Sequence, residues 1–96
     1  MTVEEQKYVE ECRKKLGPEQ VQVIQMAFKY GLGIKDVRRL AIPKLNAEQM
    51  RQTVYAVLEN VDSELIELCC QGTFDQYQIT EIISGSVSGL TKEEIL

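Results

Sequence analysis

The stretch "NAEQMRQTVYAVLENVDSELIELCCQGTF", residues 46–74, carries the start and stop signals of two successive helices. Asn46 can accept a backbone N–H of a first helical turn, and Gln49 can reach back to the cap from three residues on. Apolar residues then recur at the i, i+4, i+7 and i+8 spacing of a helix with one buried side. They are Met50, Val54, Val57 and Leu58. Asn60 ends this helix because asparagine tolerates the left-handed conformation, and a shorter helix is predicted over about 62–71.

The same signals recur when the chain is laid against itself with an offset of about 29 residues. The glutamine and the apolar residue that open the first helix of each pair recur, as do a small residue and a turn residue further on. The equivalent positions are Gln20-Val21, Gln49-Met50 and Gln78-Ile79; Ala27, Ala56 and Gly85; and Gly31, Asn60 and Gly89. The sequence therefore predicts tandem helix pairs, with units over about 1–16, 17–45, 46–74 and 75–96, the first and last of them partial.

These units predict seven helical segments and no strand in a single domain. The ranges that can be bounded are 3–16, 18–30, 34–41 and 62–71; two further helices follow Asn46 and Asp75, and a last segment runs to Leu96. The helix over 18–30 is apolar on two sides, which predicts that it lies between neighbours. Its two apolar sets are Val21, Ile24 and Phe28, and Val23, Met26 and Tyr30; in the helix after Asp75 the expected inward residues are Ile79, Ile82, Ile83 and Val87. The predicted fold is all-α: helix-turn-helix-like pairs of about 29 residues, stacked into a small right-handed-solenoid-like bundle.

Composition disfavours an enzyme. The 96 residues include no histidine, the commonest general base near neutral pH and the commonest metal ligand. The three cysteines, Cys12, Cys69 and Cys70, lie inside helical patterns without metal-ligand spacing, so we expect buried thiols, no catalytic residue, no cofactor and no metal. No segment has the length of apolar residues that a membrane span requires, and the start of the chain is polar and acidic. We therefore expect a cytoplasmic protein without a membrane partner.

Charge is unevenly distributed around a net value of −4. Residues 29–51 hold six basic and two acidic side chains, whereas residues 52–96 hold one basic and eight acidic. Such a separation can steer partners and favours head-to-tail self-association.

A DNA-binding alternative centres on residues 20–42. Ala27, Gly31 and Val37 have the spacing of a helix-turn-helix, and the second helix presents basic side chains that could meet phosphates and guanine edges. The candidate nucleic-acid contacts are Lys35, Arg38, Arg39 and Lys44. Helix packing, a turn and a solvated face explain the same residues, and the equivalent helix one unit later, "DSELIELCCQ", is acidic and would repel phosphate.

A family resemblance also indicates a repeat fold. The run "AIPKLNAEQM", residues 41–50, followed by Ala56, Val61 and Asp62, is similar to short helical repeats of the form A-x-P-K-(F/L)-(D/N)-x-x-Q-M-x-x-I-x-x-G-x-x-x-G-L-D. Such repeats occur in uncharacterised proteins of Firmicutes and their mobile elements, and the likeness is clearest across residues 18–62. Thr53 stands in place of the usual isoleucine, and Ala56 and Asn60 in place of the two glycines. The resemblance implies a fold and a bacterial origin, and it implies no activity.

The predicted function is a non-enzymatic protein-interaction or scaffolding module. Tyrosines and other apolar side chains exceed what single helix faces need, which favours a groove that takes a segment of a partner protein. The candidate contact residues are Tyr30, Tyr55 and Tyr77. Coverage of these side chains by neighbouring units is the other interpretation of the same residues.

Overall fold

A computed structural model describes residues 1–89, which form six α-helices and no strand. The helices are α1 (Val3–Arg13), α2 (Pro18–Lys29), α3 (Ile34–Leu40), α4 (Ala47–Leu58), α5 (Ser63–Cys70) and α6 (Gln76–Val87). The all-α prediction is confirmed for this part of the chain. The seventh predicted segment falls on residues outside the described range.

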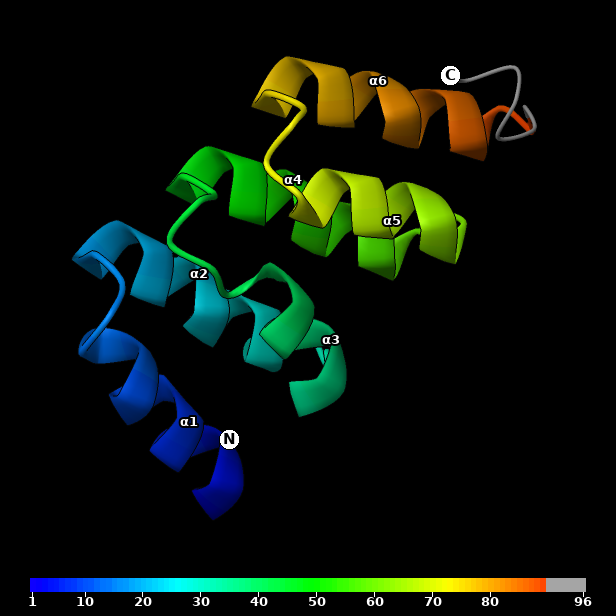
Figure 1. Cartoon of the computed structure of the whole chain (residues 1–96). Coiled ribbons are helices and arrows are strands. Elements are labelled where there is room, and N and C mark those ends of the chain that lie inside the picture. Colours follow the sequence, from blue (N-terminus) through cyan, green and yellow to red (C-terminus); the bar gives the residue numbers. More distant parts are fainter. Residues whose placement is uncertain (90–96) are drawn as a thin grey trace.

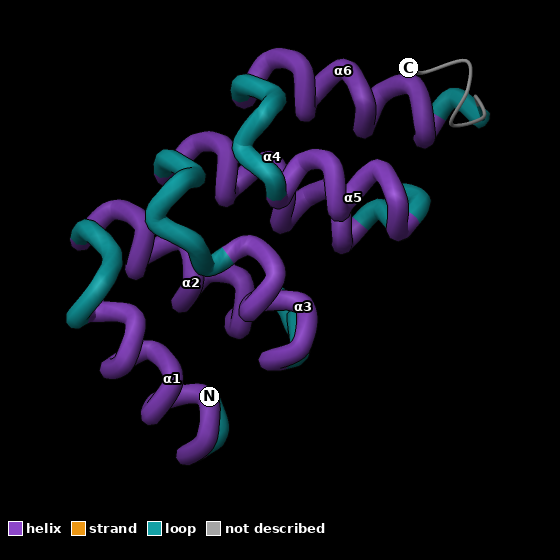
Figure 2. Tube along the Cα trace, in the orientation of Figure 1, coloured by secondary structure: helices purple, strands orange, loops and turns teal. Residues whose placement is uncertain are grey.

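The helices form two layers (Figure 1). The helices α2, α4 and α6 lie side by side and run in the same direction, with α4 in contact with both of the others. The shorter helices α3 and α5 contact each other and pack in front of α2 and α4, while α1 packs on α2 at the end of the stack. Figure 2 shows that the loops preceding α2, α4 and α6 lie along one edge of the molecule. The result is an elongated body of 40 × 22 × 16 Å.

Capping residues start three of the helices, and two of these residues, Asn46 and Asp75, stand where the sequence predicts a helix start. Thr2, Asn46 and Asp75 each accept a hydrogen bond from the backbone N–H three residues on, at 3.0, 2.8 and 2.8 Å. In return the side chain of the residue three positions on accepts the backbone N–H of the cap. Each pair of bonds satisfies two backbone donors that a helix start leaves free, which explains why these helices begin where the sequence indicates.

The predicted turn residues follow the ends of α2, α4 and α6. Gly31, Asn60 and Gly89 adopt positive φ angles of 96°, 56° and 87°. After the first two, a backbone N–H reaches back to the carbonyl of a fully buried alanine: Leu32 to Ala27 and Val61 to Ala56, each at 3.1 Å. The alanines therefore allow close helix approach while their carbonyls complete the turns.

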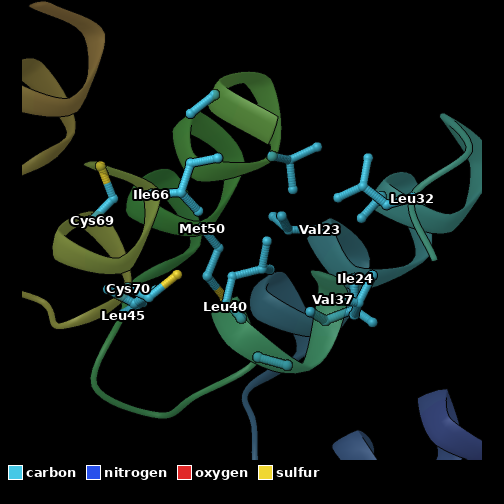
Figure 3. Close-up of a cluster of buried hydrophobic side chains, with 14 of the residues drawn as sticks. Val23, Ile24, Leu32, Val37, Leu40, Leu45, Met50, Ile66, Cys69 and Cys70 are labelled. Atoms are coloured by element: carbon cyan, nitrogen blue, oxygen red, sulfur yellow. The ribbon is translucent and has the colours of Figure 1, made fainter. Parts of the chain in front are cut away.

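The core lies between the two layers (Figure 3). Side chains from α2, α3 and α4, including Ile24, Leu40 and Met50, are fully buried, and α5 adds Leu65. On α2, Val21 and Ile24 are buried on one side and Val23 on the other, which confirms that this helix lies between neighbours. Met26 is half-buried, and Tyr30 is exposed.

Two residues that the apolar pattern places in the core lie outside it. Leu58 and Val87 are 42% and 63% exposed, so the prediction that they point inward is wrong. A residue eight positions after the first member of a stripe is rotated by about 80° around the helix, because each residue turns it by about 100°. Met50 and Ile79 are fully buried, and the residues eight positions on therefore lie at the rim of the buried side.

The predicted helix lengths are also slightly too great. The helix α1 ends at Arg13 instead of residue 16, α3 at Leu40 instead of 41, and α5 covers Ser63–Cys70 instead of 62–71. These differences fall on last turns and cap positions, where hydrogen bonding changes from helix to loop.

Candidate functional site: the outer face of α2, α4 and α6

The exposed apolar side chains of the described residues gather on one side of the molecule, apart from Met1 and Val3 at its start. The helices α2, α4 and α6 bury one side against the other layer and expose the opposite side. We call that exposed side the outer face. It consists of Glu19, Gln22, Met26, Lys29 and Tyr30 from α2 and its cap, Glu48, Arg51, Tyr55, Leu58 and Glu59 from α4 and its cap, and Tyr77, Thr80, Ser84 and Val87 from α6.

Apolar side chains form a row at the ends of these three helices. Leu58 and Val87 are the last residues of α4 and α6 and lie 29 positions apart, and Tyr30, 54% exposed, directly follows Lys29, the last residue of α2. One turn before these residues, Met26 and Tyr55 are half-buried. The row therefore crosses the stack from α2 to α6 at one edge of the outer face.

Two of the three tyrosines predicted to bind a partner lie toward the same edge of the outer face. Tyr30 and Tyr55 lie toward the carboxyl ends of neighbouring helices. Tyr77, 74% exposed, stands in the first turn of α6, and since the three helices are parallel it lies toward the opposite edge. The tyrosines thus share a face without forming one cluster.

Hollows in this face run beside the helices. One of about 490 Å³ is lined mainly by Glu19 and Gln22 of α2 and by Glu48 and Arg51 of α4, the last two forming an ion pair. Another, of about 570 Å³, lies along α2 beside Met26 and Tyr30. Both are open and lined by mixed polar and apolar groups, which suits a protein surface better than an enclosed small-molecule pocket.

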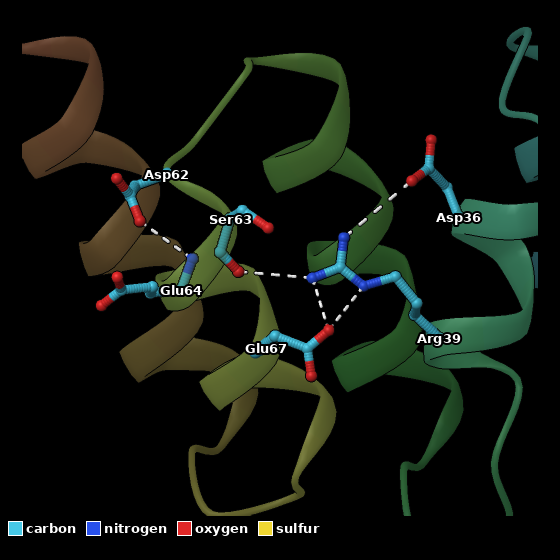
Figure 4. Close-up of polar contacts among 6 residues, drawn as sticks. All are labelled: Asp36, Arg39, Asp62, Ser63, Glu64 and Glu67. Atoms are coloured by element: carbon cyan, nitrogen blue, oxygen red, sulfur yellow. Dashed lines mark hydrogen bonds and ion pairs between the residues drawn. The ribbon is translucent and has the colours of Figure 1, made fainter.

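Arg39, one of the four candidate DNA contacts, is held by the neighbouring helix (Figure 4). Its Nη2 lies 2.7 Å from Glu67 Oε1 and donates to the Ser63 carbonyl at 3.3 Å, and its Nε donates to Glu67 at 2.8 Å. Asp36 lies 4.0 Å from Nη1. A phosphate could engage this guanidinium only by competing with two carboxylates that already surround it.

Of the other three candidates, Lys35 and Arg38 lie on α3 with Arg39, and Lys44 lies in the loop between α3 and α4. The guanidinium of Arg38 lies over the ring of Tyr8, with Cζ 5.6 Å from the centroid, in a cation–π contact between α3 and α1. A Cβ at Gly72 would lie 2.9 Å from Lys44 Cγ, so the stem of Lys44 passes close over the backbone after α5. Lys35 is exposed on α3. The structure does not gather the four into one free basic surface on a recognition helix.

The three cysteines are buried and free, which confirms the prediction of buried thiols. Burial raises the pKa of Cys69 and of Cys70 to about 11 each, and it also raises the pKa of Cys12. A thiol held in its neutral form is a poor nucleophile and a poor metal ligand. Residues 1–89 contain no group of three or more His, Cys, Asp or Glu side chains placed to hold a metal ion.

Sequence reasoning missed the contribution of Leu58 and Val87 to the outer face. Both residues were predicted to point into the core because they are apolar. Their position at the edge of the apolar stripe already indicated that they could be exposed. It also missed the ion pair of Arg39 with Glu67. The two residues are 28 positions apart, close to the predicted offset of about 29 residues, and an acidic residue at that separation was a signal for contact between the shorter helices of two predicted units.

The chain matches no family model, and comparisons with curated proteins and with solved structures give no significant match. None of the helices in the described range is long and apolar enough to cross a membrane.

Proposed function

We propose that this chain is a protein-interaction module without enzymatic activity, built from tandem helix pairs with a period of about 29 residues, and that its binding surface is the outer face. The observation that carries the proposal is the row of exposed apolar side chains at corresponding ends of α2, α4 and α6. Exposed apolar side chains gathered on one face favour a contact with another protein.

Corresponding hydrogen bonds support the proposal of repeated units. The side-chain nitrogen Nε2 of Gln20 donates to the Leu45 carbonyl at 2.6 Å, and that of Gln49 donates to the Phe74 carbonyl at 2.8 Å. Each bond joins the first helix of a pair to the loop that precedes the next pair. A stack coupled in this way extends a continuous face along its length, as interaction repeats do.

The arrangement of the second layer favours a protein partner over DNA. Its basic helix α3 lies beside α5, whose Glu67 engages Arg39 in the last turn of α3. Negative charge next to a basic surface reduces its attraction for a phosphate backbone. We therefore place the binding surface on α2, α4 and α6 and assign α3 a packing role.

Site-specific photocrosslinking in the native cell tests this function. A benzophenone amino acid at position 58 is expected to capture a discrete protein, and the adduct is expected to disappear when Tyr55→Glu is added. The matched control carries the same photoreactive residue at Lys35, which is exposed on the other layer. Equal adducts at both positions, or no protein adduct at position 58, would overturn the proposal.

A further inference from the structure

We propose that the occupant of the outer face is a second copy of this chain, paired antiparallel through α4 about a two-fold axis. The inference rests on the proposed function, because it names the partner of the same surface. It is carried by the charges and the spacing of one line of residues along α4.

Arg51, Tyr55 and Glu59 lie four positions apart and therefore follow one another along the exposed side of α4. When two such helices face each other antiparallel with the two-fold axis at Tyr55, Arg51 of each copy lies opposite Glu59 of the other. Two-fold symmetry makes this pairing occur twice. The line is therefore complementary in charge to its own antiparallel copy.

Within one copy, the charge on Glu59 is poorly compensated. Glu59 is the C-cap of α4, where the carbonyl end of the helix dipole disfavours a carboxylate, and the last turn of α4 has no basic residue. Glu59 makes no ion pair with any residue of the described range. Within the described range, Arg51 pairs with Glu48 of its own helix, in a contact between two partly exposed side chains, and such surface pairs contribute little stability. Both side chains are thus available for a stronger contact.

The neighbouring helices are compatible with the same axis. The positions equivalent to Tyr55 are Met26 on α2 and Ser84 on α6, so the side chains that meet their own copies on the axis are uncharged. One turn to either side, Gln22 faces Tyr30 of the second copy, and Thr80 faces Ser88. A symmetric contact must not place like charges opposite one another. The lines of residues described on α2, α4 and α6 meet this condition.

The size of the face fits a modest dimer. Three adjacent helices of 12 residues, each about 18 Å long and about 10 Å wide, present roughly 550 Å² in projection. The accessible surface area of the outer face is larger than this projected area, because side chains make the surface uneven. The face therefore reaches the lower range of specific interfaces, about 600 Å² per partner. We expect a reversible dimer with a dissociation constant in the micromolar range, weakened by salt.

Sedimentation velocity over a concentration series tests the pairing. The wild-type chain is expected to pass from 11.0 kDa to twice that mass as its concentration rises. Arg51→Glu and Glu59→Arg are each expected to weaken dimerisation at least about tenfold, because each places like charges opposite one another. An equimolar mixture of these two variants is expected to dimerise, since both ion pairs then form between unlike chains. Lys35→Glu, on the other layer, is the matched control and is expected to behave as wild type.

Rescue in the mixture shows that the single variants are folded, so loss of structure cannot imitate the result. A wild-type chain that remains monomeric at about millimolar concentration overturns the inference, and so does a dimer that both single variants retain. If the chain is monomeric while position 58 still captures a different protein, the dimer is wrong and the proposed function stands. If the chain is monomeric and position 58 captures no protein, both the dimer and the proposed function are wrong.

Discussion

Replacing Gln49 by glutamate is expected to remove one of the two hydrogen bonds that this side chain makes and to retain the other. Its Oε1 accepts the backbone N–H of Asn46 at 2.8 Å, and its Nε2 donates to the Phe74 carbonyl at 2.8 Å. A glutamate retains the acceptor at the helix start but cannot donate when ionised, and it places a carboxylate oxygen against a carbonyl oxygen. Gln78 is the matched control, because it accepts the backbone N–H of Asp75 at 2.9 Å while its Nε2 donates to no described residue.

The magnitude follows from the bonds lost and retained. Loss of the donor leaves a partly buried carbonyl facing negative charge, at a cost of about 1–3 kcal/mol in free energy of unfolding. A negative charge in the first turn of a helix stabilises the fold by about 0.3–1 kcal/mol. We therefore expect Gln49→Glu to destabilise the fold by about 1–2 kcal/mol, and Gln78→Glu to be neutral or slightly stabilising.

Thermal unfolding followed by circular dichroism at pH 7 measures both variants. For a domain of this size, a change of about 1 kcal/mol moves the melting temperature by about 4–8 °C, so Gln49→Glu is expected to melt roughly 5–15 °C below Gln78→Glu. Gln20→Glu should resemble Gln49→Glu, because Gln20 donates to the Leu45 carbonyl in the same way. Equal melting temperatures for all three variants would refute the idea that these glutamines couple successive helix pairs.

Three further outcomes follow from burial and charge. Burial raises the pKa of Cys69 and Cys70 from 9.0 to about 11, so the folded chain holds these thiol protons more tightly than the unfolded chain. The free energy of unfolding should therefore fall between about pH 9 and 11. Urea titrations should show a smaller fall in the variant that carries both Cys69→Ala and Cys70→Ala. Met50→Ala should cost about 2–5 kcal/mol by leaving a cavity, whereas Leu58→Glu should change the free energy of unfolding by less than about 0.5 kcal/mol; comparable losses in chemical denaturation would contradict the placement of the two side chains. Glu67→Gln should cost less than about 1 kcal/mol in free energy of unfolding, since the Glu67 side chain is more than half exposed. A much larger loss in urea unfolding would indicate that the ion pair with Arg39 holds the two short helices together.

The helix starts and the turns after α2 and α4 were predictable because they depend on local chemistry. An Asn or Asp three residues before a glutamine has few better partners than the first backbone amides of a helix, and Asn60 adopts the left-handed conformation at φ 56° as its residue type suggested. Burial of the central apolar residues was also predictable, because the spacing of apolar residues indicates which side of a helix faces the core.

The outer face was predictable only in part. The tyrosines were identified as surplus apolar residues, but Leu58 and Val87 were assigned inward because a one-dimensional pattern does not show where the covered arc of a helix ends. The basic residues of α3 were equally ambiguous. Whether Arg39 is available to a partner depends on Glu67, 28 residues later, and that contact exists only once the two helices are placed side by side.

Residue-resolved amide NMR spectra test the central claim, that the outer face is the binding surface, most directly. Spectra would be recorded as the chain is concentrated from about ten micromolar to about one millimolar, and again with random-sequence duplex DNA at low salt. We predict concentration-dependent shifts at Tyr55, Leu58 and Glu59, with the amides of α3 unchanged in both series. Shifts confined to Lys35, Arg38 and Arg39 on addition of DNA, with an unchanging outer face, would contradict the claim.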